Sequence, residues 1–215
     1  MRHTPSGRRT KERPIGCHSD FVCFSFQAIK HLTTVDGGAL TCRKSSTYKR
    51  GKLLRWFGID REAERRDFRC EEDIKEHGYK FHMNDVYATI GLEQLRHVDR
   101  ILARHRANAA YYNAELAGLS GAGLLETKSD RSSSYWLYTI LVEDRADFMK
   151  QMNEAKITVS QVHSRNDKHT MMREFQRNRP GVDAFSEKNV SIPVGWWLSD
   201  EERAYIAETV RRVRG

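Results

Sequence analysis

Apolar residues follow two different spacings along the chain, and these divide it into strand-like and helical stretches. Aromatic and aliphatic side chains crowd into residues 21–26, and a second run at 38–42 also has the composition of a strand. From Asn84 onward, apolar residues recur at intervals of three and four, which predicts a long helix capped by Asn84 or Asp85. We expect this helix to bend or break before Gly118.

The last third of the chain alternates between the two spacings. We predict strands at 135–142, 157–162 and 190–194, and helices at 146–155, 171–177 and 199–212. Ser199 and Glu202 form a capping-box pattern at the start of the last helix. Such alternation is typical of a small α/β unit. We place the boundary between this unit and the preceding part of the chain in 118–134.

The charge of the chain bears on its partners. The formal net charge is +8, which is a reason to consider nucleic acid as a partner. Residues 1–13 hold five basic side chains against one acidic side chain, so half of the excess lies in a short tail. The remaining charge is spread out with acidic neighbours interspersed, which is the pattern of a solvated surface. We therefore predict no nucleic-acid partner.

The four cysteines and the hydropathy indicate the compartment. The cysteines contain no C-x-x-C pair and the chain shows no zinc spacing, so we predict free thiols and no metal site. No apolar run approaches the ~20 residues of a membrane helix, and the polar start lacks a signal-peptide core. We predict a cytoplasmic protein with no membrane partner.

The stretch from Phe24 to Gly38 contains the groups from which an amine nucleophile can be built. Lys30 lies among apolar neighbours, Ser25 ends the predicted strand, and a glycine pair follows at 37–38. Desolvation lowers the pKa of a lysine and favours the neutral amine, which attacks carbonyl groups. A hydroxyl and a glycine-freed backbone can hold a phosphate beside it. Lys30 is therefore a candidate Schiff-base lysine, and an ordinary solvated lysine is the alternative.

Nine residues of this region keep the spacing of a known active-site segment. They follow the pattern G-x-x-x-D-x-x-x-F-S-F-x-x-x-K-x-x-T-x-x-x-G-G, as Gly16, Asp20, Phe24, Ser25, Phe26, Lys30, Thr33, Gly37 and Gly38. In this the chain resembles the DegT/DnrJ/EryC1/StrS family of pyridoxal-phosphate-dependent sugar aminotransferases. The resemblance implies that Lys30 forms the internal aldimine with pyridoxal 5'-phosphate and that Ser25 contacts its phosphate. Asp36 stands where the family usually has glutamate.

A second stretch resembles the family's pattern G-Y-N-Y-R-M-x-x-x-x-A-A-x-G-L-x-Q-L. The matching residues are Gly78, Tyr79, Met83, Gly91, Leu92, Gln94 and Leu95. Lys80 stands where the family has an asparagine that reaches the cofactor phosphate of the partner subunit. The resemblance thus implies a homodimer. Lys80 is either a phosphate contact, as a point charge, or a residue on a solvated edge.

The resemblance also implies an α/β fold, that of the fold-type-I pyridoxal-phosphate transferases. Residues 14–117 would be the C-terminal part of the cofactor-binding large domain, and 118–215 the small α/β domain. The family's proteins are longer, so the portion that stacks on the pyridine ring would be missing. For the tail at 1–13 we hypothesise a frameshift, because one nucleotide string can encode residues 2–11 in one frame and a family-like segment in another.

The function implied by the resemblance is transfer of an amino group to a nucleotide-linked keto-sugar, for polysaccharide, lipopolysaccharide or amino-sugar biosynthesis. Glutamate would be the amino donor. In the loop at 163–169, His163 or Arg165 would meet a phosphate of the substrate. Two alternatives stay open. One is a sugar dehydratase of the same fold, in which the family replaces the lysine by histidine. The other is an inactive remnant, or a non-catalytic dimerising partner, of an aminotransferase.

Overall fold

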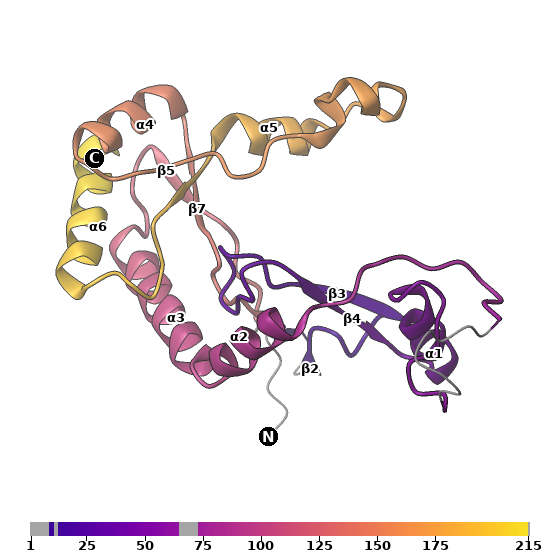
Figure 1. Ribbon diagram of the computed structural model, residues 1–215. Helices are drawn as coiled ribbons and strands as arrows, with labels where there is room; N and C mark the ends of the chain where they lie inside the picture. Colours follow the sequence, from indigo (N-terminus) through magenta and orange to yellow (C-terminus); the bar gives the residue numbers. More distant parts are fainter. Residues whose placement is uncertain (1–8, 11–12, 65–72, 215) are drawn as a thin grey trace. The chain divides into compact units, whose positions relative to one another are not determined.

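The computed structural model describes residues 9–10, 13–64 and 73–214, and it forms two compact units, 1–99 and 100–215 (Figure 1). The division falls near the start of helix α3 (Val98–Glu115), ahead of the 118–134 stretch where we expected a boundary. The physical reason is that α3 packs into the second unit, where Ala109 and Tyr112 are fully buried. The assignment of 14–117 and 118–215 to a large and a small domain stays a prediction.

The first unit is built around a hairpin of two strands, β3 (Phe21–Ser25) and β4 (Gly38–Cys42). They pair antiparallel, from Phe21 opposite Cys42 to Ser25 opposite Gly38. Both strands agree with the hydrophobic pattern of the sequence. A long loop joins them, and it carries Lys30.

Three shorter elements complete the early part of this unit. Strands β1 (Arg9–Thr10) and β2 (Arg13–Pro14) pair antiparallel and overlap the predicted tail, whose other residues lie outside the described part of the chain. The frameshift proposed for that tail stays a hypothesis. Helix α1 (Ser45–Leu54) follows β4.

The long helix predicted from Asn84 is two helices, α2 (Asp85–Leu95) and α3. The Asn84 side chain caps α2 by accepting a hydrogen bond from the backbone N–H of Tyr87 at 2.9 Å. The break comes at Arg96 and His97, whose N–H groups donate to carbonyls three residues earlier instead of four. Such tightened bonds are common in the last turn of a helix.

The second unit contains a three-stranded antiparallel sheet in the order β5-β7-β8. The strands are β5 (Ala122–Leu124), β7 (Tyr138–Val142) and β8 (Asn189–Ile192), and a two-residue strand, β6 (Arg131–Ser132), precedes β7. Residues at alternate positions of β7 are buried, as expected of a strand with one face on a core. That core also includes side chains from α3, α4 (Arg145–Glu154) and α6 (Asp200–Arg214).

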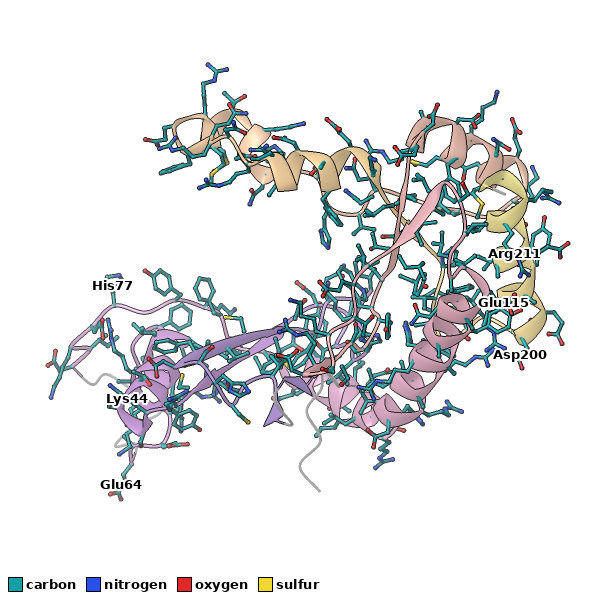
Figure 2. All side chains as sticks on the ribbon, turned by 180° about the vertical axis from the view of Figure 1, so that it is seen from behind. Lys44, Glu64, His77, Glu115, Asp200 and Arg211 are labelled. Carbon is teal, nitrogen blue, oxygen red and sulfur yellow. The ribbon has the colours of Figure 1, made fainter. Side chains whose placement is uncertain are left out.

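Helix α6 is oriented on α3 by two ion pairs, and its start confirms the predicted capping box. Arg211 contacts Glu115 at 2.6 Å (Figure 2), and Arg104 contacts Asp200 at 2.7 Å. At the N-terminus, the Ser199 N–H donates to the Glu202 carboxylate at 2.8 Å, and the Glu202 N–H donates to the Ser199 hydroxyl at 3.1 Å. Exposed ion pairs contribute little energy, so the buried apolar contacts stabilise this packing.

The segment between α4 and β8 differs most from expectation. The strand predicted at 157–162 is reduced to a single bridge between Ser160 and Ser191. The helix predicted at 171–177 is a 3-10 helix, η2 (Thr170–Phe175), which follows η1 (Asn166–Lys168). Helix α5 (Pro180–Lys188) was not predicted. Ile157 and Val159 are buried, which explains why their alternation resembles a strand although the backbone is barely paired.

Candidate active site

The loop that joins β3 to β4 is closed by backbone hydrogen bonds, and Lys30 lies in a tight turn inside it. The Phe26 N–H donates to the Gly37 carbonyl at 2.9 Å, which extends the hairpin one step beyond its last strand pair. The Thr34 N–H donates to the Phe26 carbonyl at 2.8 Å, and the Lys30 N–H donates to the Gln27 carbonyl at 2.9 Å. The backbone therefore holds Lys30 five residues beyond the end of β3.

Two threonine hydroxyls form hydrogen bonds with backbone groups of this loop. The Thr33 hydroxyl donates to the Phe26 carbonyl at 3.2 Å and accepts from the Val35 N–H at 2.9 Å. The Thr34 hydroxyl donates to the Asp36 carbonyl at 2.6 Å. These bonds hold Val35 at a φ of 71°, a left-handed conformation that a β-branched residue rarely adopts. Such strain persists only where the surrounding structure fixes the backbone, and it is common at functional sites.

Helix α2 lies directly against the lysine loop, and this explains a glycine that the family pattern shares. A Cβ atom built on Gly91 would lie 2.7 Å from the Cγ2 atom of Thr34, which is buried. Gly38, at the start of β4, is equally constrained, since a Cβ there would lie 2.5 Å from the Phe24 carbonyl oxygen. Both glycines thus allow a close approach that fixes the shape of the loop.

The electrostatics of Lys30 and Ser25 fit a ligand that carries an aldehyde and a phosphate. Lys30 is partly buried, and this desolvation lowers the pKa of its ammonium group below the ordinary value. The Ser25 side chain is exposed at the end of β3, and its hydroxyl accepts a 3.4 Å bond from the Gln27 N–H. An amine with a lowered pKa suits the aldehyde, and an accessible hydroxyl suits the phosphate, so pyridoxal phosphate matches these two groups.

Lys80 lies in another part of the first unit, in an isolated bridge to Trp56. Its side chain is exposed. Within the described part of the chain, no hydrogen bond joins Lys80 to Ser25. The phosphate role that the resemblance implies for Lys80 stays a prediction.

Arg165 and His163, the predicted substrate contacts, lie in the second unit on either side of Ser164. The Arg165 side chain is only 6% exposed and forms ion pairs with Asp167 and Asp183. Its Nε–H donates to Asp167 at 2.8 Å, and an Nη2–H donates to the Arg177 carbonyl at 2.9 Å. The hydrogen bonds to Asp167 and Asp183 raise the pKa of Arg165, and the bond from Arg165 lowers the pKa of Asp167. The sequence did not reveal these partners of Arg165.

A pocket of about 440 Å³ opens between this loop and helix α5. His163 and Arg165 line it, and the ring of His163 lies 6.0 Å from that of Trp136. Arg179 and Phe185 line the pocket too, and our reading of the sequence overlooked both because it placed no helix at 180–188. Pro180 at the first helical position, directly after a polar run, was the available signal. Among the described residues, no three or more His, Cys, Asp or Glu side chains gather as metal ligands.

A partly desolvated lysine five residues after a strand-end serine, on an α/β scaffold, fits the class of pyridoxal-phosphate transferases. The family model described as the DegT/DnrJ/EryC1/StrS aminotransferase family matches residues 5–211. The chain belongs to this family, and the predicted membership is confirmed.

Solved structures confirm the α/β fold class. The sugar aminotransferase CalS13 from Micromonospora echinospora is 38% identical, with a TM-score of 0.91 over 96% of this chain and 55% of that chain. The PLP-form of the putative sugar aminotransferase Spr1654 from Streptococcus pneumoniae is 29% identical, with a TM-score of 0.85 over 97% of this chain and 55% of that chain.

Curated relatives are more distant and longer. A UDP-4-amino-4,6-dideoxy-N-acetyl-beta-L-altrosamine transaminase of Campylobacter jejuni is 26% identical over 215 residues, which are 95% of this chain and 55% of the relative. The chain thus spans about half the length of the curated relatives it matches. No helix in the described residues combines the length and the apolar character needed to cross a membrane.

Proposed function

We propose that this chain supplies the lysine-bearing part and the small α/β part of a pyridoxal-phosphate-dependent aminotransferase acting on a nucleotide-linked keto-sugar. The observation that carries the proposal is Lys30, whose pKa is lowered by burial in a hydrogen-bonded loop that starts at Ser25. Membership of the family over residues 5–211 supports the same role.

The residues of this chain would act on a cofactor that supplies an aldehyde to accept the amino group and a ring to withdraw electrons. Lys30, as the neutral amine, would bond to the aldehyde carbon and release water. Once displaced by the donor amine, the Lys30 amine would carry a proton to and from the reacting carbon. The Ser25 hydroxyl would donate a hydrogen bond to the phosphate. The closed loop and the contact between Gly91 and Thr34 would keep the two groups in place.

The finer details of this function are also proposals. The named activities of two relatives, the altrosamine transaminase and a GDP-perosamine synthase of Escherichia coli, support a nucleotide-linked sugar as substrate. We propose glutamate as the amino donor, a homodimer in which Lys80 reaches the partner's cofactor phosphate, a cytoplasmic location, and a role in polysaccharide or amino-sugar biosynthesis. His163, exposed at the pocket mouth, would contact the substrate.

One alternative has an observation in its favour. Many large apolar side chains of the chain's first unit are exposed. This exposure fits a non-catalytic dimerising partner, and an inactive remnant of such an enzyme is the other form of this alternative. The presence of Lys30 argues against the dehydratase, in which histidine takes that position.

The test is to trap the bond between Lys30 and the cofactor. The purified chain is mixed with pyridoxal phosphate, reduced with borohydride, digested and examined by mass spectrometry. We expect the label on Lys30, and we expect Lys30→Ala to remove it together with the visible absorbance. Lys44→Ala, a change at an exposed lysine of the same unit (Figure 2), is the matched control and should change neither. A label spread evenly over many lysines would show that this chain alone does not select the cofactor.

A further inference from the structure

The pocket beside α5 has two walls of different chemistry. The loop that includes His163 forms a polar wall, and Val182 and Phe185 of α5 form an apolar one. Its volume of about 440 Å³ falls in the range of pockets that hold small ligands. A flat apolar group can lie on Phe185 while charged groups meet the polar wall.

Arg165 lines this pocket, but its charge is already neutralised. Two carboxylates, from Asp167 and Asp183, flank one guanidinium, so the three side chains together carry a net charge of −1. The Arg177 carbonyl accepts a further N–H. An anion that approached Arg165 would have to displace these partners from a buried guanidinium, at the cost of leaving the carboxylates unpaired.

Through the same contacts, Arg165 connects three segments of the chain. Asp167 belongs to η1, Asp183 belongs to α5, and Arg177 precedes α5 in the chain. Figure 1 shows α5 and the segment before it extending away from β7. Arg165 therefore holds the two walls of the pocket together.

Arg179 is better placed than Arg165 to bind an anion. It directly precedes α5, lines the pocket and is exposed. In the part of the chain that the structure describes, no carboxylate lies within ion-pair distance of its guanidinium. Of the two arginines that line the pocket, Arg179 thus has the uncompensated charge, and a guanidinium can bind phosphate oxygens in a bidentate manner.

We propose that Arg179 binds the phosphates of the nucleotide-linked substrate, and that Arg165 is a positioning residue that shapes the pocket without touching the ligand. This assignment rests on the proposed function. It replaces the sequence-based expectation of a direct contact by Arg165. The nucleobase or sugar would lie on the Phe185 wall.

The test of Arg179 is calorimetric titration of the chain with UDP, GDP and dTDP, separately. At least one should bind, and Arg179→Gln should weaken that binding about tenfold or more, since a hydrogen bond to a charged group contributes about 1.5–3 kcal/mol. Arg173→Gln, an exposed arginine of η2 that does not line the pocket, is the matched control and should bind as the wild type does. Equal affinity in the Arg179 variant, or no binding of any of the three, would overturn the proposal.

The positioning role needs a separate readout. Asp183→Asn removes one ion pair of Arg165 and leaves Arg179 in place. We expect it to weaken nucleotide binding several-fold in protein whose circular dichroism shows an intact fold, and to add little in combination with Arg179→Gln. A purely structural role would lower the unfolding temperature and leave the nucleotide Kd unchanged, and that outcome would overturn the positioning role.

The two proposals fail in different ways. If borohydride does not label Lys30 but nucleotide binding still depends on Arg179, only the aminotransferase function is overturned. If Lys30 is labelled but Arg179→Gln does not change nucleotide binding, only the assignment of the phosphate site is overturned.

Discussion

The two units of the chain differ in where they keep their apolar side chains. In the second unit, eighteen buried apolar residues from three helices, the sheet and the connecting segments form one cluster. In the described residues of the first unit, the large buried apolar side chains are Leu32 and Val98. Yet the first unit carries Lys30. The comparison teaches that the large buried core and the candidate reactive lysine lie in different units.

The hairpin of the first unit shows the consequence most clearly. Phe21 and Leu40 are each about half exposed, and an isolated two-stranded hairpin is marginally stable in water. Tyr79 and Phe81 stack on each other at 4.9 Å and are exposed as well. Burial of such side chains would contribute roughly 25 cal/mol per Å². A surface that covered these side chains would therefore stabilise the first unit.

Two phenylalanine truncations give the largest expected contrast. Phe148 is fully buried in α4, so Phe148→Ala should lower the free energy of unfolding by about 3–5 kcal/mol. Phe21→Ala, on the exposed hairpin, should lower it by less than about 1 kcal/mol. Urea unfolding followed by circular dichroism measures both. Equal losses would mean that the hairpin shares in a core as much as α4 does.

Two left-handed residues give the next largest contrast. Lys156 follows α4 at a φ of 62°, where glycine is favoured, so Lys156→Gly should raise the unfolding free energy by about 1 kcal/mol. Val35→Gly should relieve the same kind of strain in the lysine loop. It should leave the unfolding free energy of the second unit unchanged. Urea unfolding measures the effect of Lys156→Gly, and hydrogen exchange at the loop measures the effect of Val35→Gly.

The control for this pair is Lys150→Gly, at an exposed position inside α4. There glycine should lower the unfolding free energy by about 1 kcal/mol. If glycine raised the unfolding free energy at both Lys156 and Lys150, backbone conformation would not decide the sign of the change.

The smallest effect concerns pH. Because burial lowers the pKa of Lys30, its reactive neutral amine should predominate from a lower pH in the folded chain than in the unfolded chain. Borohydride-trapped labelling at Lys30, measured against pH with and without urea, should show the folded profile shifted to lower pH. Identical profiles would mean that the fold does not tune this amine.

The sequence predicted what depends on local pattern. The strands around Lys30, the cap at Asn84 and the capping box at Ser199 each follow from neighbouring residues, and the structure contains all three. The family pattern singled out Lys30 and Ser25 because they lie five residues apart in one short segment, and their roles stay predictions.

What the sequence missed depends on distant contacts. Arg165 meets Asp183, eighteen residues away, on a helix that was not predicted. The strand expected at 157–162 is reduced to one bridge, between Ser160 and Ser191, on the edge of β8 that faces away from β7. Neither choice of partner is visible in the periodicity of one segment.

The contact between Gly91 and Thr34 has a mechanical consequence. The backbone of α2, and not a flexible side chain, lies against the lysine loop there. Because residue 91 has no side chain, the backbone of α2 approaches the Thr34 methyl group of this loop directly. A larger residue at position 91 would therefore force α2 and the lysine loop apart.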